Sequence, residues 1–224
     1  MVGRIFAVAE AQARDLARRR AAMALLVLLP LAFYLTTPSQ DEFALVAGGT
    51  GMAWAVAGGA LFLTLASRRI DSRLVLAGYR PREVLVGRLL LLEGLALVLV
   101  ALFSALMVGV SSPTDPGALV LAVALSGLVA VPLGLAVAAV FPRELEGALT
   151  LIAVVGIEMG LPVDSGLAPF LPLWGPLKLV EVARGAAEGL ALPTLHALAS
   201  TVVLLAISAA LWWRRVRVTR HAAL

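Results

Sequence analysis

The sequence predicts an all-α integral membrane protein, organised as a single transmembrane domain over residues 1–224. The chain is 61% hydrophobic and only 14% charged, whereas a soluble domain contains roughly 25% charged residues. Its apolar runs come close to the about 20 residues that a helix needs to cross a bilayer. Its basic residues gather in alternate connections between those runs, which is typical of multi-pass membrane proteins.

The first 20 residues predict an amphipathic helix on the membrane surface. Glu10, Arg14 and Arg18 line one face of this helix, and apolar residues recur on another at intervals of three and four. The apolar positions are Val2, Phe6, Ala9, Ala13 and Leu16. A cleaved signal peptide is the alternative, but no clear small-residue cleavage site follows the first apolar run, so we expect the segment to be retained.

Six apolar segments then predict six transmembrane helices, which form a core at residues 21–213. The first and fifth segments are short for a bilayer. A five-span variant, in which the fifth segment is re-entrant, is therefore an alternative. The six segments are residues 21–37, 47–67, 89–110, 118–140, 148–163 and 192–213.

The placement of the basic residues predicts the orientation of the chain. If the N-terminus is cytoplasmic, sixteen of the 18 basic residues lie on the cytoplasmic side and only Lys178 and Arg184 lie outside. Short cytoplasmic loops retain Lys and Arg during insertion. We therefore expect a multi-pass protein of the cell membrane with both termini in the cytoplasm, including a basic tail at residues 214–224.

Two acidic residues fall within predicted spans, Glu93 and Glu158. A charged side chain at mid-bilayer costs roughly 2.5 to 3.5 kcal/mol on insertion scales, so such residues often face a cavity or a substrate path. Glu93 lies near the end of its span, so as an alternative its side chain could reach toward Arg88 or another cytoplasmic arginine. For Glu158, a role that only stabilises the structure is an equally open interpretation.

A stripe of small residues marks the second predicted span. Its members recur every four residues, and small side chains let helix backbones approach closely in a membrane. Packing within the chain and an interface with a second subunit are both open interpretations. The stripe consists of Ala47, Gly51, Ala55 and Gly59.

The connection before the last span, residues 164–189, is unusually apolar. Three prolines interrupt helix formation, a short amphipathic piece follows, and Trp174 suits an interfacial anchor. A solvated loop is the alternative. We expect a re-entrant or interfacial helical segment that dips into the outer face of the membrane.

The sequence lacks the motifs of several kinds of catalytic site. Cysteine is absent, and His196 and His221 have no partner at metal-ligand spacing. The only lysine is Lys178, which does not follow a glycine-rich loop, so the chain has no P-loop for ATP. We expect a protein that is not itself an enzyme, with no metal or cofactor of its own and no nucleic-acid partner.

Three stretches carry a resemblance to a known family. Residues 83–90, with Glu83 and Arg88, resemble the pattern that leads into the third span of type-2 ABC transporter permeases, the exporter class of membrane subunit. Residues 141–148 resemble that family's short turn before the fifth span. Pro176 with Glu181 and Arg184 resembles its segment before the sixth span.

The resemblance implies a fold and two partners. It implies a cytoplasmic coupling helix between the second and third spans, an ATP-binding cassette subunit that binds ATP and Mg on the cytoplasmic face, and a second permease subunit in a membrane dimer. The substrate would be hydrophobic or amphipathic, such as a drug, lipid or peptide. The residues expected to couple to the ATP-binding subunit are Arg68, Arg69, Asp71, Arg73, Arg80, Arg82, Glu83 and Arg88.

Two other functions are open at this point. A permease subunit of a haem or cytochrome biogenesis system has a similar size and number of spans. A membrane immunity or assembly factor that only binds partners is the alternative outside transport. A neighbouring reading frame with the sequence G-x-x-x-x-G-K-[ST] would favour the two transport functions.

Overall fold

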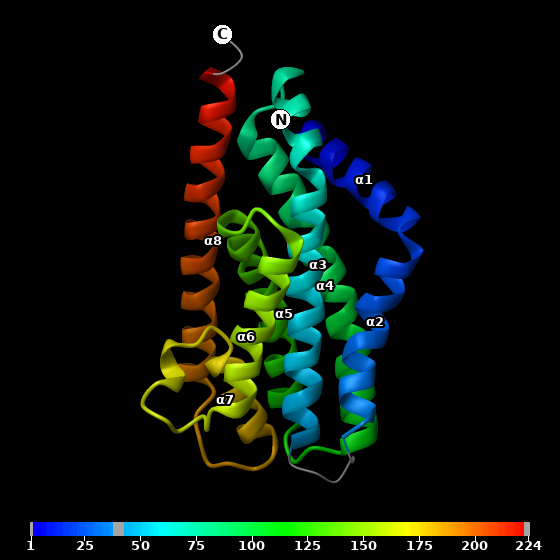
Figure 1. Cartoon of the computed structure of the whole chain (residues 1–224). Coiled ribbons are helices and arrows are strands. Elements are labelled where there is room, and N and C mark those ends of the chain that lie inside the picture. The colour runs from blue at the N-terminus through cyan, green and yellow to red at the C-terminus, as the bar shows by residue number, and fades with distance from the viewer. Residues whose placement is uncertain (1, 38–42, 222–224) are drawn as a thin grey trace.

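The computed structural model describes residues 2–37 and 43–221, which fold into α-helices and one short 3-10 helix, η1 (Figure 1). A membrane protein is expected to take this form, because backbone polar groups in lipid must be paired within the chain. The helices are α1 (Val2–Arg18), α2 (Arg20–Leu35), α3 (Phe43–Leu76), α4 (Pro81–Ser111), α5 (Pro116–Val140), α6 (Glu144–Gly160), η1 (Ala168–Phe170), α7 (Trp174–Ala183) and α8 (Ala191–His221).

Four of the described helices are long and apolar enough to cross a membrane. They are Phe43–Arg68 within α3, Pro81–Ser111, Pro116–Val140 and Ala191–Arg214 within α8. These match the second, third, fourth and sixth segments expected from the sequence. The first and fifth segments lie on α2 and α6, which have 16 and 17 residues. The expected all-α fold is therefore confirmed, with four helices long and apolar enough to cross a membrane, whereas the six-span layout remains a proposal.

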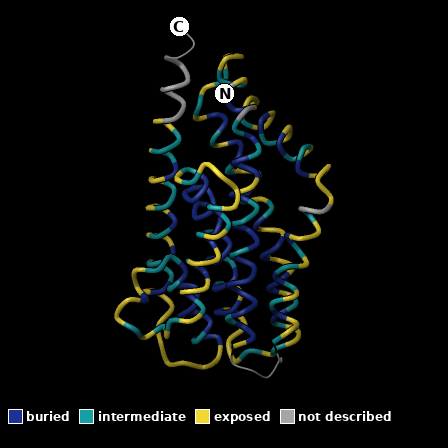
Figure 2. The backbone as a smooth tube through the Cα atoms, viewed as in Figure 1, coloured by how far each residue is buried: buried dark blue, intermediate teal, exposed yellow. Residues whose placement is uncertain are grey.

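Helix α5 forms the centre of the bundle. It packs against α3, α4, α7 and α8, and most of its residues are buried, as the dark core of the bundle in Figure 2 reflects. The approach of α3 is especially close at Gly134, where an added Cβ atom would lie 2.1 Å from the carbonyl oxygen of Ala57. Only glycine leaves room for the two backbones at this crossing.

The two ends of the bundle differ in composition. We call the end that carries the connection between α3 and α4 the arginine-rich end, and the opposite end, with η1 and α7, the α7 end (Figure 1). The expected N-terminal helix is present as α1, which buries Val8, Gln12 and Leu16. Val2 and Phe6 point outward and are more than half exposed, at 64% and 62%.

One expectation at the arginine-rich end is wrong. No separate coupling helix lies between α3 and α4, because α3 continues without a break to Leu76 and α4 begins at Pro81. The expected basic tail after residue 213 is helical as far as His221, where α8 ends. Residues 222–224 of that segment lie outside the described part of the chain.

Candidate functional site

The connection between α3 and α4 is a tight helical hairpin whose turn is encoded locally. Gly78 has φ +90°, a left-handed conformation that glycine adopts readily. The amide of Tyr79 donates to Leu74 O at 3.0 Å and that of Gly78 to Val75 O at 3.1 Å, which is the Schellman pattern that ends a helix. Pro81 then begins α4, and the Glu83 carboxylate accepts a hydrogen bond from the backbone amide of Arg80 at 2.8 Å.

The hairpin extends past the end of α5 at the arginine-rich end, to about the level that the last turns of α8 reach (Figure 1). Arg68 marks the level at which α5 ends, because its guanidinium donates to Ala138 O at 2.6 Å, Phe141 O at 3.0 Å and Pro142 O at 3.1 Å. These are carbonyls of the last turn of α5 and the residues after it. Helix α3 continues eight residues past Arg68, which corresponds to about 12 Å at 1.5 Å per residue.

A buried ion pair joins the two arms of the hairpin. Arg88 Nη2 lies 2.6 Å from Asp71 Oδ1, and the two side chains are 0% and 7% exposed. The guanidinium carbon of Arg88 lies 5.2 Å from the centre of the Trp212 ring, so α8 joins the same contact through a cation–π interaction. We call Arg88 and Asp71 the Arg88 pair, which the Trp212 ring covers.

The Arg88 pair and Trp212 use only part of their hydrogen-bonding capacity. Arg88 Nε and Nη1, Asp71 Oδ2 and Trp212 Nε1 are buried without a hydrogen-bond partner among the described residues. Burial raises the pKa of the Asp71 carboxyl above its ordinary value, although the charges of Arg88 and Arg68 oppose this rise. Buried charge with unused hydrogen-bonding capacity is energetically costly.

Helix α1 braces the outer side of the hairpin. An added Cβ atom at Gly87 would lie 2.8 Å from Ile5 O and 2.9 Å from Val8 Cβ, so α1 and α4 touch closely at this glycine. Arg4 Nη1 donates to Gly78 O at 3.0 Å, and its guanidinium lies 5.7 Å from the Tyr79 ring. The hairpin is therefore attached to α1, α5 and α8.

The structure divides seven of the eight coupling residues expected from the sequence into two groups. Arg73, Arg80 and Arg82 are exposed on the hairpin beside Leu76, which is 72% exposed. Asp71, Glu83 and Arg88 are buried, and Arg68 caps α5, so these four hold the hairpin together. The side chain of Arg69 lies outside the described part of the structure.

A second feature is an apolar groove bounded by α2, α3 and α6. Its volume is about 450 Å³, and its walls include Leu25, Leu29, Trp54, Phe62 and Leu151. Gly58 and Gly59 of α3 form part of its floor, and two charged residues, Arg19 and Glu144, also line it. The groove is thus mostly apolar with two opposite charges on its wall.

The small-residue stripe of α3 lies against α2. An added Cβ atom at Gly51 would lie 2.9 Å from Phe33 Cβ, and one at Gly59 would lie 2.9 Å from Leu26 Cδ2. Ala47 and Ala55 are also buried within the chain. The stripe therefore lets α2 approach α3, and Ala55 and Gly59 additionally line the groove.

The two carboxyl groups that the sequence places within expected spans do not meet at the groove, which neither of them lines. Glu93 is half-buried, and Arg88, one of the arginines that it was suggested to reach, pairs with Asp71 instead. Glu158 is 2% exposed, and its Oε1 accepts the amide of Leu173 at 2.7 Å. Because Leu173 immediately precedes α7, Glu158 positions the start of that helix.

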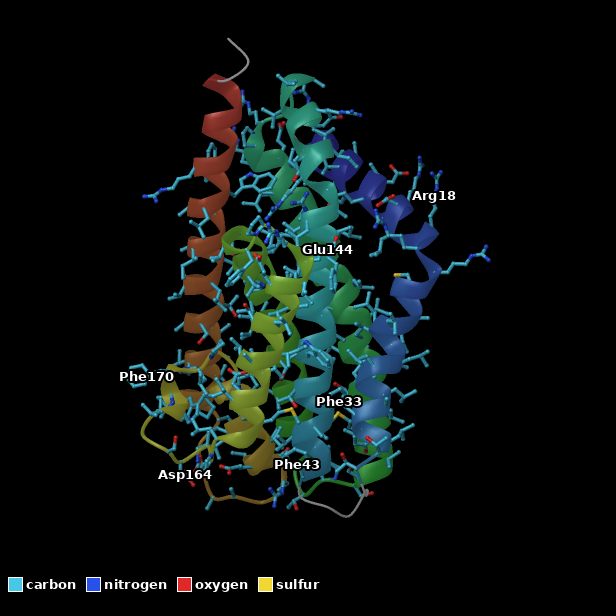
Figure 3. The ribbon with its side chains drawn as sticks, in the orientation of Figure 1. Arg18, Phe33, Phe43, Glu144, Asp164 and Phe170 are labelled. Carbon is cyan, nitrogen blue, oxygen red and sulfur yellow. The ribbon has the colours of Figure 1, made fainter. Side chains whose placement is uncertain are left out.

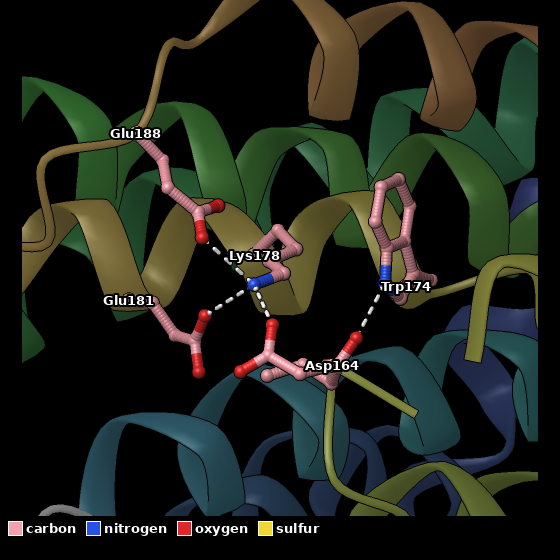
Figure 4. Close-up of polar contacts among 6 residues, drawn as sticks. Asp164, Trp174, Lys178, Glu181 and Glu188 are labelled. Carbon is pink, nitrogen blue, oxygen red and sulfur yellow. Dashed lines mark hydrogen bonds and ion pairs between the residues drawn. The ribbon is translucent and has the colours of Figure 1, made fainter. Parts of the chain in front are cut away.

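The α7 end contains a cluster that sequence reasoning missed. Lys178 Nζ lies 2.5 Å from Asp164 Oδ1, 3.0 Å from Glu181 Oε2 and 2.9 Å from Glu188 Oε1 (Figure 4). Burial alone would lower the pKa of Lys178, but the three carboxylates together hold it above its ordinary value. Only the spacing of Lys178 and Glu181 on one helix could have been read from the sequence.

The remaining residues expected at the α7 end are mostly packed into it. Trp174 donates from Nε1 to Val163 O at 2.9 Å and packs edge-on against His196, with the two ring centres 4.8 Å apart. Pro176 is buried in α7. Arg184 is exposed, and its carbonyl accepts a bond from Thr114 Oγ1 at 3.4 Å.

Comparison with known proteins gives no identity: no protein-family model and no curated protein sequence matches the chain.

Proposed function

We propose that this chain is the membrane-spanning permease subunit of an ABC exporter. Helices α2, α3, α4, α5, α6 and α8 cross the membrane, and the arginine-rich end and both termini face the cytoplasm. A separate ATP-binding cassette subunit hydrolyses ATP beneath this end. A second permease subunit completes the dimer, and the transported substrate is hydrophobic or amphipathic.

The observation that carries this proposal is the α3–α4 hairpin. It projects about 12 Å past the end of α5, and its exposed side chains include three arginines and Leu76. Such a surface suits a protein partner with complementary charge. The hairpin is also bonded to α1, α5 and α8, so a displacement of its tip is transmitted to several helices at once.

The groove supports the substrate class. Its volume of about 450 Å³ is within the roughly 300 to 1,000 Å³ of typical small-molecule sites. Apolar walls favour an apolar body, and Arg19 with Glu144 provides opposite charges for a polar group. A hydrophobic or amphipathic molecule fits this combination, whereas a strongly hydrated solute does not.

The hairpin is tested by charge reversal at its tip. The variant Arg73→Glu/Arg80→Glu is expressed with the product of a neighbouring reading frame that contains the ATP-binding motif. The amount of partner that co-purifies should fall about tenfold or more, equivalent to about 1.4 kcal/mol of binding free energy. ATP hydrolysis by the complex should lose its stimulation by substrate.

The matched control is Arg14→Glu, which also reverses an exposed arginine at the arginine-rich end but lies on α1. Thermal unfolding of the purified proteins verifies that both variants remain folded. If a folded hairpin variant retains as much partner as the control, the proposed coupling role is wrong.

The groove is tested separately by filling it. An added Cβ atom at Gly58 meets nothing within 4 Å, although this residue lines the groove, so Gly58→Leu should reduce the volume without distorting α3. Transport of an apolar dye should fall while co-purification with the ATP-binding subunit is retained. Gly94→Leu is the control, because Gly94 is also open to space but lies on α4 away from the groove.

A further inference from the structure

A small pocket lies between α1 and the part of α3 that forms one arm of the hairpin. Helix α1 packs mainly against α4, and Figure 3 shows Arg18 on the outer side of α1, away from α3. Between α1 and α3 a volume of about 140 Å³ remains. We call this volume the α1 pocket. Its walls are formed by Ala7, Val8, Ala11, Gln12, Asp15, Ser67, Ile70, Leu74 and Tyr79.

Gln12 is a polar residue on the otherwise apolar buried face of α1. It lies one turn from Val8 and one turn from Leu16, and these three residues are the buried ones of the helix. Gln12 is 7% exposed, and neither its Nε2 nor its Oε1 has a hydrogen-bond partner among the described residues. A buried amide without a partner is costly. Because Gln12 lines the α1 pocket, its donor and its acceptor are available to a molecule bound there.

The other walls of the α1 pocket are mostly small or apolar. Ala7 and Ala11 lie one turn apart on α1, and their short side chains leave room beside the amide. Helix α3 contributes Ile70 and Leu74, which are apolar. A bound molecule would therefore need an apolar body as well as a group that hydrogen-bonds.

The charge and size of the α1 pocket favour a small neutral molecule. Asp15 is the one charged side chain among the lining residues that the structure describes, and its carboxylate disfavours an anion. Asp15 is already paired with Arg19 at 3.0 Å, so it does not require a cation from the ligand. The volume of about 140 Å³ is close to the roughly 150 Å³ of a cavity that holds one benzene ring.

We propose that the α1 pocket binds a small neutral molecule with one apolar ring or a short apolar chain, whose hydroxyl group bonds to Gln12. A hydroxyl can donate to Oε1 and accept from Nε2, whereas a hydrocarbon of the same size leaves both atoms unpaired. Water would satisfy the amide but would leave the apolar walls hydrated. The α1 pocket shares no lining residue with the groove of α2, α3 and α6, so this inference is independent of the proposed transport function.

The test compares two probes that differ in one group, 4-fluorophenol and 4-fluorotoluene. The whole protein is placed in phosphatidylcholine nanodiscs, and each probe is titrated and followed by fluorine NMR, with empty nanodiscs as the blank. The unmodified protein should bind 4-fluorophenol about tenfold more tightly, equivalent to about 1.4 kcal/mol. In Gln12→Leu this preference should disappear, because leucine has a similar size but makes no hydrogen bond.

Three further variants locate the bound probe. Ala11→Leu fills the α1 pocket and should weaken binding of 4-fluorophenol at least tenfold. The matched control is Ala17→Leu, which is exposed on the same helix but does not line the pocket, and it should bind like the unmodified protein. Gly58→Leu narrows the groove and should also leave binding unchanged. Thermal unfolding verifies that each variant is folded.

Three results would overturn the proposal. An equal affinity of the unmodified protein for both probes, or a preference that persists in Gln12→Leu, would mean that the amide binds only water. Loss of binding in Gly58→Leu but not in Ala11→Leu would place the probe in the groove. Displacement of 4-fluorophenol by dioctanoylglycerol would show that a lipid hydroxyl occupies the pocket in place of a free small molecule.

Discussion

A buried or nearly buried cation stabilises each end of the molecule, but the two arrangements are built on opposite principles. At the arginine-rich end, Arg88 is completely buried and meets one carboxylate, Asp71, which leaves several polar atoms unpaired. At the α7 end, Lys178 meets three carboxylates that remain in contact with water to different degrees. The first joins long helices deep in their interface, and the second joins a helix to the loops around it.

This difference predicts how strongly the stability of each end responds to a substitution. Among the described residues, no other charged side chain replaces a lost member of the Arg88 pair, so loss of either one leaves the other charge buried without a partner. The Lys178 cluster is redundant, because any two carboxylates still neutralise the ammonium and the third can be hydrated. We therefore expect the arginine-rich end to respond strongly to single substitutions and the α7 end to respond weakly.

The largest effect is expected from Asp71→Leu. This change leaves Arg88 buried without a counter-ion, and a guanidinium does not lose its proton in proteins. Breaking a buried pair from one side costs about 3 to 5 kcal/mol. The free energy of unfolding, measured by denaturant titration in detergent, should fall by this amount, and the double variant Asp71→Leu/Arg88→Met should recover most of it. An equally unstable double variant would show that the pair itself is not the cause.

A smaller effect is expected from Arg88→Met, with a distinctive pH dependence. Asp71 can become neutral by binding a proton, and its pKa is already above the ordinary 3.8 because of burial. Removing Arg88 raises this pKa further, because a charge that lowers it disappears. The folded protein then binds a proton that the unfolded chain has released, so stability falls as pH rises from 3.8 through the raised pKa, by up to about 1.4 kcal/mol per pH unit.

The check on Arg88→Met is a series of unfolding measurements across that pH range. The difference in stability between wild type and Arg88→Met should widen as pH rises. A difference that is independent of pH would mean that Asp71 is neutral or hydrated in both proteins, and the contrast between the two ends would then rest on packing alone.

The turn of the hairpin is encoded locally in the sequence, whereas the contacts inside the hairpin are not. Gly78 and Pro81 encode a turn through local backbone preferences, so the break between α3 and α4 could be located without a structure. The pairing of Asp71 with Arg88 depends on the rotation of α3 against α4, and Trp212 comes from a helix more than 100 residues away. Neither the relative rotation of two helices nor a contact with a third is encoded in a local pattern.

The same limit explains the outcome at the α7 end. Residue type pointed to Trp174 as the membrane anchor, because tryptophan is enriched at membrane interfaces. The structure packs Trp174 against His196 and leaves Phe170 exposed, since the turn of η1 decides which apolar side chain faces outward. The Lys178 cluster was missed because Asp164 and Glu188 approach from loops on both sides of α7.

A third prediction concerns the cation of the outer cluster, with Lys178→Met. The carboxylates that remain are 81%, 28% and 45% exposed, so water can solvate them, and we expect a loss of only about 1 to 2 kcal/mol. The raised pKa of Lys178 means that this stabilisation is complete below its ordinary pKa of 10.5 and disappears only as pH rises through the higher folded value. The stability gap between wild type and Lys178→Met should thus stay constant from neutral pH to about 10.

The smallest effect is expected from Glu188→Gln. Its carboxylate is 45% exposed and lies 2.9 Å from Lys178 Nζ, but Asp164 and Glu181 remain to neutralise the ammonium, and the amide oxygen of the substituted side chain can still accept a hydrogen bond. Exposed ion pairs of this kind contribute about 0 to 1 kcal/mol, so the unfolding free energy should change by less than about 0.5 kcal/mol. The sharper measurement is a double-mutant comparison, in which Glu188→Gln is made in the presence and absence of Glu181→Gln. If the cluster is redundant, the second substitution costs more when the first is present. Equal costs in both backgrounds would mean that each carboxylate acts alone, and the contrast with the single-partner Arg88 pair would then be one of exposure to water.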